Sequence, residues 1–272
     1  MNRRYFLASA SAGLATGIAG CVGMGSDRPF DEADWRDGDG LDLPVLAERH
    51  TEALVEAGGV TLFATAEADH DGEEQPNPWL PSQEYESGYD VENGRQYVRE
   101  ELTDDGEPEV SELFIADDEA LFRQRIGDRV QYDRRPIDLT DDQLVETMRS
   151  EVVTGIRVEG ETTEGEAEYE GLNLWNLTSD GEGEVRDEPT ARFAADAFDG
   201  ERTVPSTIET ASATVHVFES GIVPRLNQSW EGDHDDQTVT VDIDIDYRDP
   251  GAEIPEPEWL ADAREATGAA DT

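Results

Sequence analysis

The C-terminal third of the chain alternates between apolar and polar residues with a period of two. In the stretch "TVTVDIDIDY", every second position from Val239 to Tyr247 is apolar, and threonine or aspartate occupies the positions between them. The stretch "TASATVHVF" repeats this pattern with Val215 and Val217, and "VTLFATAEA" repeats it earlier in the chain. Successive side chains of a strand point to opposite faces, so the pattern predicts half-buried antiparallel strands with one face on a core.

Two other segments have the spacing of amphipathic helices. Apolar residues recur at helical intervals from residue 44 to residue 57, and the pattern ends at Gly58. A second apolar stripe follows Thr140 and Gln143, which form a capping box. The chain therefore combines two helices with a sheet that is mainly antiparallel, which indicates the α+β class.

The rest of the chain is less regular. Shorter alternating runs predict further strands near residues 60–68, 95–102, 110–116, 155–162 and 168–177. Gly127-Asp128 separates two such runs and favours a tight hairpin. We interpret the acidic stretch 179–190 as a loop and the following "ARFAADAFDG" as a helical turn. No internal repeat and no second domain are evident.

The N-terminus has the organisation of an export signal. Arg3 and Arg4 precede a mildly apolar run, as in twin-arginine signals, which export folded proteins. The apolar run is shorter than the ~20 residues that a membrane-spanning helix needs. We therefore predict a signal peptide of the twin-arginine type over residues 1–20.

The chain holds one cysteine, and it follows this apolar run directly. Ile18, Ala19 and Gly20 precede Cys21, and this order is typical of a lipobox, where cleavage before the cysteine exposes a thiol that receives a lipid. A signal with a chance cysteine is the alternative, and the lipobox is favoured. We expect lipidation of Cys21, which would anchor the protein on the extracellular side of the cell membrane.

These segments divide the chain into four parts. After the signal, residues 21–40 are rich in glycine and aspartate, without periodicity, and indicate a lipid-anchored flexible tether. Residues 41–266 carry the helix and strand patterns and are expected to form a single domain. Residues 267–272 are expected to fray.

The end of the tether contains "DGDGLD", in which Asp37, Asp39 and Asp42 offer oxygen atoms around a glycine. Calcium loops of the EF-hand type have similar spacing but also need a later glutamate, which is missing here. We therefore interpret the stretch as hydrated chain and predict no metal site.

The overall charge is strongly negative. There are 66 Asp and Glu residues against 20 basic residues, all of them arginines, which gives a formal net charge of −46. Such a surface repels nucleic acids and anionic headgroups. At molar salt the Debye length falls to ~3 Å and the self-repulsion weakens. We expect a salt-adapted protein that is monomeric and does not bind nucleic acid.

Motifs for catalysis and cofactor binding are missing from the sequence. It lacks Gly-x-Ser-x-Gly, His-Glu-x-x-His, a phosphate-binding glycine loop and the dinucleotide fingerprint. His50 lies on the apolar stripe of the first helix, where we expect a structural role. We predict no catalytic residues, no enzyme activity and no cofactor.

A cluster of arginines is the exception to the acidic composition. Between residues 121 and 135 two aspartates accompany five arginines, namely Arg123, Arg125, Arg129, Arg134 and Arg135. Guanidinium groups on a hairpin could bind a phosphate or carboxylate bidentately, which makes the cluster a candidate anion patch. The alternative, which we favour, is that they balance acidic residues on neighbouring strands.

Two N-glycosylation sequons occur, at Asn176 and at Asn227. In an exported protein these asparagines are candidate glycan sites and would have to be exposed. Chance occurrence is the equal alternative.

Several of these features together resemble a known group of proteins. The lipobox, an early helix followed by "AGGVT", middle hairpins rich in tyrosine and arginine, and the closing "PEPEWL" resemble the small acidic lipoproteins of salt-loving archaea. The C-terminal third, with "ESGIVPRL" and "VTVDIDIDYRDPGAEI", also resembles the lipoprotein-carrier (LolA/LppX-like) fold. The resemblance implies a curved half-barrel sheet with two or three helices packed on its concave face, which in carriers holds acyl chains or a lipidated client. It transfers no catalytic residue.

The leading functional hypothesis follows from this resemblance and from the alternation. We expect a non-enzymatic lipoprotein that binds a lipid, an acyl chain or another hydrophobic client, and whose other partner is the cell membrane. The candidate apolar ligand face consists of Val215, Val217, Val239, Val241, Ile243 and Ile245. The alternative is a cell-surface module with a packed core and no ligand, which would bind an envelope protein.

Overall fold

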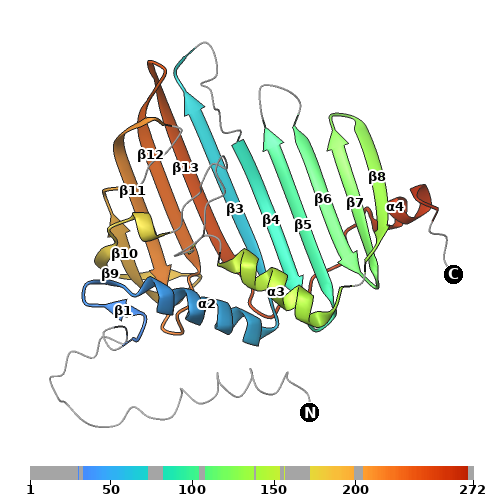
Figure 1. Cartoon of the computed structure of the whole chain (residues 1–272), viewed down its shortest axis with the longest axis horizontal. Coiled ribbons are helices and arrows are strands. Elements are labelled where there is room, and N and C mark those ends of the chain that lie inside the picture. The colour runs from blue at the N-terminus through green and yellow to red at the C-terminus, as the bar shows by residue number, and fades with distance from the viewer. Residues whose placement is uncertain are drawn as a thin grey trace, which may run out of the picture.

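The computed structural model describes residues 30, 33–72, 82–103, 108–137, 139–153, 156, 172–198 and 205–268. Within these residues, eleven antiparallel strands form one sheet in the order β8-β7-β6-β5-β4-β3-β13-β12-β11-β10-β9 (Figure 1). The strands are β3 (Gly59–His70), β4 (Ser82–Asp90), β5 (Arg95–Thr103), β6 (Glu109–Ala116), β7 (Glu119–Ile126), β8 (Arg129–Pro136), β9 (Thr178–Val185), β10 (Glu188–Ala195), β11 (Thr207–Val217), β12 (Arg225–His234) and β13 (Gln237–Arg248).

The sheet consists of two runs of sequential antiparallel neighbours, β3–β8 and β9–β13, joined where the last strand pairs with β3. In this central pairing Val241 lies opposite Ala68, and Tyr247 lies opposite Leu62. The predicted alternation of β13 therefore continues onto β3, so that both strands present apolar side chains to the same face.

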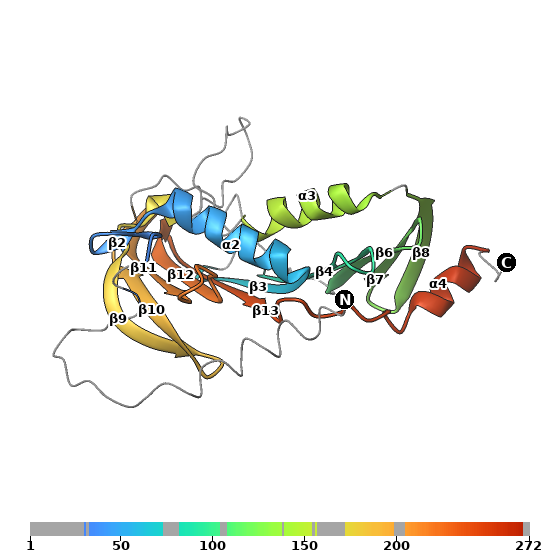
Figure 2. The ribbon, with the colours of Figure 1, turned by 90° about the horizontal axis from the view of Figure 1, so that it is seen from below.

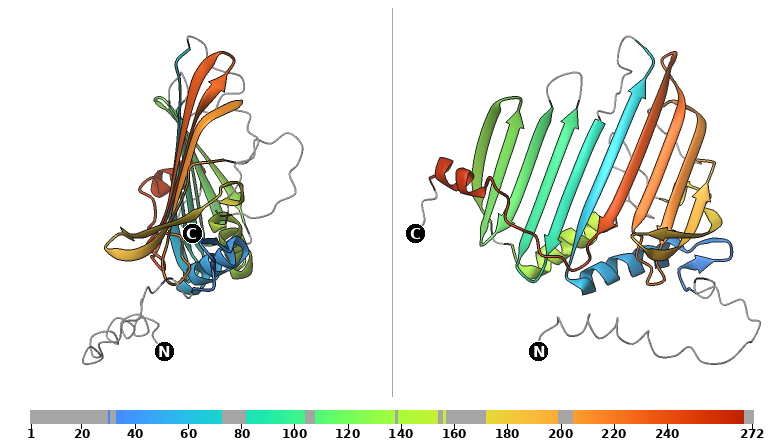
Figure 3. Two further views of the ribbon diagram at one scale, coloured as in Figure 1. Left: turned by 90° about the vertical axis from the view of Figure 1, so that its left-hand side faces the viewer. Right: turned by 180° about the vertical axis from the view of Figure 1, so that it is seen from behind.

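The sheet is curved and open, and the helices lie on both of its sides. Helices α2 (Leu43–Ala57) and α3 (Asp141–Val152) cross the concave face near one end of the strands, whereas α4 (Leu260–Ala266) lies on the convex side near β7 and β8 (Figures 2 and 3). This arrangement confirms the predicted α+β half-barrel with two helices on the concave face; the third helix lies on the other face. No helix in the described part of the chain is both long and apolar enough to cross a membrane.

Local sequence explains where the two long helices begin and end. The Asp42 side chain accepts a hydrogen bond from the Val45 amide, and Gly58 ends α2 in the left-handed conformation with φ +83°. The capping box of Thr140 and Gln143 is present at the start of α3. Both helix predictions are therefore confirmed.

Buried side chains form three clusters. The largest fills the concave side of β10–β13 beneath the first half of α2, the second lies beneath α3, and the third lies on the convex side next to α4. The concave side thus contains most of the core, and the convex side contains a smaller one.

Two expectations about the second half of the chain are wrong. The stretch 179–190 is not a loop, and the following residues are not helical, because β9 and β10 form a hairpin there. Arg186 and Asp187 both have positive φ values, 54° and 65°, as the tight two-residue turn of a hairpin requires. Glycine and acidic residues favour strands only weakly, but β9 is an edge strand, where solvated polar side chains are tolerated.

Ordered structure begins before the expected boundary at residue 41. Phe30 and Trp35 are 3% and 1% exposed and belong to the largest core cluster, and the short strands β1 (Arg36–Asp37) and β2 (Gly40–Leu41) form a hairpin. The later part of the expected tether is therefore part of the domain, because its aromatic side chains are buried. Apart from Ile156, the strand expected near 155–162 lies outside the described residues, as does the end at 269–272. Within the strand expected near 168–177, residues 172–174 instead form a 3₁₀ turn.

Candidate functional site

Four residues of the candidate ligand face lie inside the packed core. Val215, Val217 and Val239 are 0% exposed, and Val241 is 1% exposed. They belong to one core cluster with Trp35, with Leu46 of α2 and with Leu172, Trp175 and Leu177. The concave face of β10–β13 is therefore filled by the protein itself.

The other two residues of this face mark the edge of the packed region. Ile243 and Ile245 are only partly buried. On the neighbouring strand they lie opposite Ala66 and Ala64, which are also partly exposed. Both alanines have small side chains, so they add little apolar volume on this face of β3.

Partly exposed apolar residues continue from there across the concave face. Val98 on β5, Leu113 on β6 and Phe122 on β7 lie opposite one another in register. All three have intermediate exposure. Helices α2 and α3 cross this face near one end of the strands (Figure 2).

Polar groups lie where α3 meets the sheet. Tyr85 and Tyr89 on β4 face α3, and Gln96 Nε2 donates a hydrogen bond of 3.2 Å to the Tyr89 hydroxyl. Burial, followed by the charge of Glu151 on α3, raises the pKa of both tyrosines. Both phenols therefore stay neutral; that of Tyr89 is buried, and that of Tyr85 is partly exposed beside the apolar surface.

The five arginines of the candidate anion patch do not converge on one point. Strand alternation places Arg123, Arg125 and Arg134 on the convex side, and Arg129 and Arg135 on the concave side. Three of them pair with carboxylates of the same hairpin or of β6. These pairs are Arg123 with Glu112 at 2.9 Å, Arg134 with Glu119 at 2.8 Å, and Arg135 with Asp133 at 2.9 Å. The placement agrees with the charge-balancing interpretation.

The remaining predicted residues have different surroundings. Asn176 is exposed just before β9, whereas Asn227 lies within β12 and donates a hydrogen bond to Asp244. Arg3, Arg4, Ile18, Ala19, Gly20 and Cys21 lie outside the described residues.

Within the described residues, no group of three or more histidine, cysteine, aspartate or glutamate side chains is arranged to hold a metal ion. Asp42 of the acidic "DGDGLD" stretch instead caps α2.

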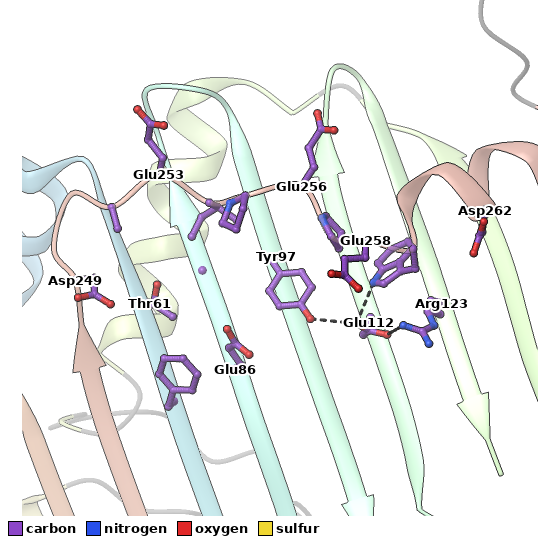
Figure 4. A pocket seen from close by; sticks show the side chains of 17 residues that line it. Thr61, Glu86, Tyr97, Glu112, Arg123, Asp249, Glu253, Glu256, Glu258 and Asp262 are labelled. Atoms are coloured by element: carbon purple, nitrogen blue, oxygen red, sulfur yellow. Dashed lines mark hydrogen bonds and ion pairs between the residues drawn. The ribbon is translucent and has the colours of Figure 1, made fainter. Parts of the chain in front are cut away.

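The convex face of the sheet carries a cleft that the sequence analysis did not predict. Residues 249–259, which we call the strap, follow β13 and cross the convex face toward α4 (Figure 4). Between the strap and the sheet is an open cleft of about 890 Å³. Its lining includes Phe63, Glu86, Tyr97, Glu112, Glu258 and Trp259.

The strap is fixed to the sheet at Ile254. A Cβ atom on Gly88 would lie 2.5 Å from Ile254 Cδ1, so the glycine allows the strap to approach the strand closely. The Ile254 amide donates to Asp90 Oδ2 at 3.3 Å, and Arg95 Nη1 donates to the Ile254 carbonyl at 3.0 Å. These contacts hold one end of the cleft in place.

Glu112 holds the other end. Its side chain accepts hydrogen bonds from the Tyr97 hydroxyl at 3.1 Å, from Trp259 Nε1 at 2.9 Å and from Arg123 at 2.9 Å (Figure 4). Burial, followed by the charge of Glu112, raises the pKa of Tyr97. With three donors around it, Glu112 is satisfied and orients the two aromatic rings.

Comparison with known proteins identifies remote structural neighbours only. No protein-family model matches the sequence, and no curated protein sequence matches it.

Three solved structures are among those to which the chain is remotely similar. Lipoprotein LppX from Mycobacterium tuberculosis is 10% identical, with a TM-score of 0.34 over 78% of this chain and 98% of that one. A DUF1329 family protein from Desulfovibrio piger is 8% identical, with a TM-score of 0.21 over 80% of this chain and 94% of that one. A LolA superfamily protein from Nitrosomonas europaea is 8% identical, with a TM-score of 0.18 over 80% of this chain and 99% of that one. The architecture described above rests on the strand pairing of this chain itself.

Proposed function

We propose that the chain is a membrane-anchored extracytoplasmic lipoprotein that binds a lipid, an acyl chain or another hydrophobic client. The ligand would lie on the concave face of the sheet, and no reaction is catalysed. The anchor is the lipid that we predict on Cys21, which would hold the domain at the outer side of the cell membrane.

The observation that supports binding is the division of the concave face into two regions. Val215 and Val241 are covered completely, whereas Ala66, Val98 and Leu113 keep partial exposure. Binding sites for hydrophobic molecules are concave and mainly apolar, with a few polar groups that orient the ligand. The partly exposed region is mainly apolar, and the partly exposed Tyr85 supplies a polar group at its α3 end.

The packed region favours a second candidate. Because the β10–β13 half is filled, a module with a complete core that binds an envelope protein remains the alternative. The two candidates differ in whether an apolar ligand stabilises the native state, since a ligand of the native state raises its stability by mass action.

The experiment starts with organic extraction of the purified protein and mass spectrometry of the extract. The protein is then titrated in high salt with the fluorescent fatty acid cis-parinaric acid. Co-purifying lipid and saturable binding would support the proposal. If neither is found, the carrier function is wrong and the interaction module is favoured.

A pair of variants on β3 tests the location. Ala66→Trp fills the space on the concave face, and we expect probe affinity to fall at least about tenfold. Thr65→Trp is the matched control, because the neighbouring side chain lies on the convex face and is exposed. Equal affinity of the two variants would place the ligand elsewhere.

A further inference from the structure

We propose that the cleft between the strap and the convex face binds an organic cation, with Glu86 as its charged contact. The chemical class is an ammonium or guanidinium group with an apolar portion, carried either by a small amine or by a basic side chain of a peptide. The cleft lies on the opposite side of the sheet from the proposed acyl-binding surface, so the two sites are independent.

Glu86 is a half-buried carboxylate in the middle of β4. On the convex face it lies between Phe63 on β3 and Arg99 on β5, in register with both. Its side chain points into the cleft (Figure 4). A partly desolvated carboxylate is unfavourable unless a cation or a hydrogen-bond donor accompanies it.

The two arginines that influence Glu86 are bonded to other carboxylates. Arg99 pairs with Glu101, and Arg248 pairs with Asp246 at 2.7 Å. Within the part of the chain that the structure describes, no hydrogen bond or ion pair reaches Glu86. Its pKa is raised by burial, in spite of both arginines. A cationic ligand would supply the partner that the protein does not.

The cleft into which Glu86 points is lined mainly by acidic residues. Asp249, Glu258 and Asp262 line the cleft, and none of them forms an ion pair with another described residue. A cleft with walls of one sign concentrates the field and attracts ligands of the opposite charge. Arg123 is the one basic residue of the lining and pairs with Glu112, so an anionic ligand would meet mainly negative charge.

Aromatic rings make an organic cation a better fit than a metal ion. Tyr97 lies beside Glu86 and is held in orientation by its hydrogen bond to Glu112. On the other side of Glu86, the Arg248 guanidinium carbon lies 4.3 Å from the centre of the Phe63 ring. This contact shows that the wall already accepts a cation on an aromatic face.

The test uses 2-phenylethylammonium and its neutral analogue 2-phenylethanol. Each is titrated calorimetrically at the lowest KCl concentration at which the far-ultraviolet spectrum stays native, because salt screens exposed charges. We expect the ammonium to bind at least about tenfold more tightly than the alcohol. Equal binding of both probes, or binding of neither, would overturn the proposal.

The variants are Glu86→Gln and Glu84→Gln. Glu84 lies on the same face of β4, but its side chain is 67% exposed and outside the cleft. We expect Glu86→Gln to lose the preference for the ammonium while the melting temperature is kept or raised, and Glu84→Gln to bind as the wild type does. The same loss in both variants would indicate a general charge effect and would refute the site.

Two further arms complete the design. The first arm measures the affinity of an oligolysine peptide. If this peptide binds more tightly than the small amine, and Glu86→Gln weakens its binding, the cation is a basic side chain. Cis-parinaric acid binding by Glu86→Gln is measured in parallel and should be unchanged. Failure of the acyl-binding proposal can thus be distinguished from failure of this one.

Discussion

The imidazole ring of His50 stands edge-on to the ring of Tyr247, with 4.5 Å between the ring centres and an interplanar angle of 76°. His50 Nδ1 accepts a hydrogen bond of 3.0 Å from the Val223 amide. The Tyr247 hydroxyl donates a hydrogen bond of 2.8 Å to the Val152 carbonyl at the end of α3. The pair therefore joins α2, α3 and β13 at the end of the sheet where the helices cross it.

This contact predicts sensitivity to acid. His50 is fully buried, and burial lowers its pKa from 6.5 to about 3. Below pH 6.5 the unfolded chain binds a proton that the native state does not bind, so stability is lost as the pH falls from 6.5 toward 3. Above pH 6.5 this histidine has no effect on the pH dependence. In His50→Gln we expect the slope of unfolding free energy against pH to decrease by up to about 1.4 kcal/mol per pH unit in that window.

Denaturant unfolding at several pH values in high salt measures this slope. His216→Gln is the comparison, because His216 is only half-buried on β11. Its pKa is lowered as well, first by burial and then by Arg225 and Arg192, so the variant should change the slope less. Identical slopes for the wild type and His50→Gln would show that His50 does not carry the effect.

A second prediction concerns the packed half of the concave face. Val217 is 0% exposed, so Val217→Trp should overpack the core and lower the unfolding free energy by ~1–3 kcal/mol. Ser212→Trp on the exposed side of the same strand should leave stability nearly unchanged. Denaturant unfolding compares the two. A neutral Val217→Trp that abolished acyl binding would show that the ligand occupies this half.

The sequence predicted the helices and the central strands because their patterns are local. The period of two in β13 predicts a strand, and the capping box of Thr140 predicts the start of a helix, each from a few consecutive residues. The hairpin of β9 and β10 was missed because glycine and glutamate favour strands weakly, and the hairpin depends on pairing with β11 and on core contacts of Phe193. The turn at Arg186 and Asp187 lacks the glycine that usually indicates such a hairpin.

The sequence could not predict how much of the apolar face is covered. Alternation assigned Val217 and Ile243 to one face, but exposure depends on segments distant in sequence, such as the one containing Trp35. The convex cleft was missed for a similar reason, because it forms only when Ile254 docks against Gly88. A glycine within a strand and an extended segment with two prolines were the signals that could have indicated a close approach of this kind.

The acid excess predicts that folding depends on salt. Aspartates alternate along the convex face of β13, and one of them, Asp242, lies opposite Glu67 of β3. Like charges in this position repel, and the repulsion weakens as the Debye length shortens. Circular dichroism should therefore show strand signal growing as KCl increases from low to molar concentration. Full structure with an unchanged melting temperature at low salt would contradict the salt adaptation.

The last prediction concerns the membrane anchor. If residues 18–21 are a lipobox, the exported protein begins at Cys21 and its intact mass includes a thioether-linked lipid. Cys21→Ser should then lose the added mass, retain the uncleaved signal and, after export, leave the membrane fraction more easily. A single acyl chain binds a membrane only marginally, with an association constant of ~10⁴ M⁻¹, so partial release of the wild type is compatible with the anchor. Intact mass is therefore the deciding measurement. A wild-type protein without added mass, or a Cys21→Ser variant with the same mass shift, would show that this cysteine is not lipidated.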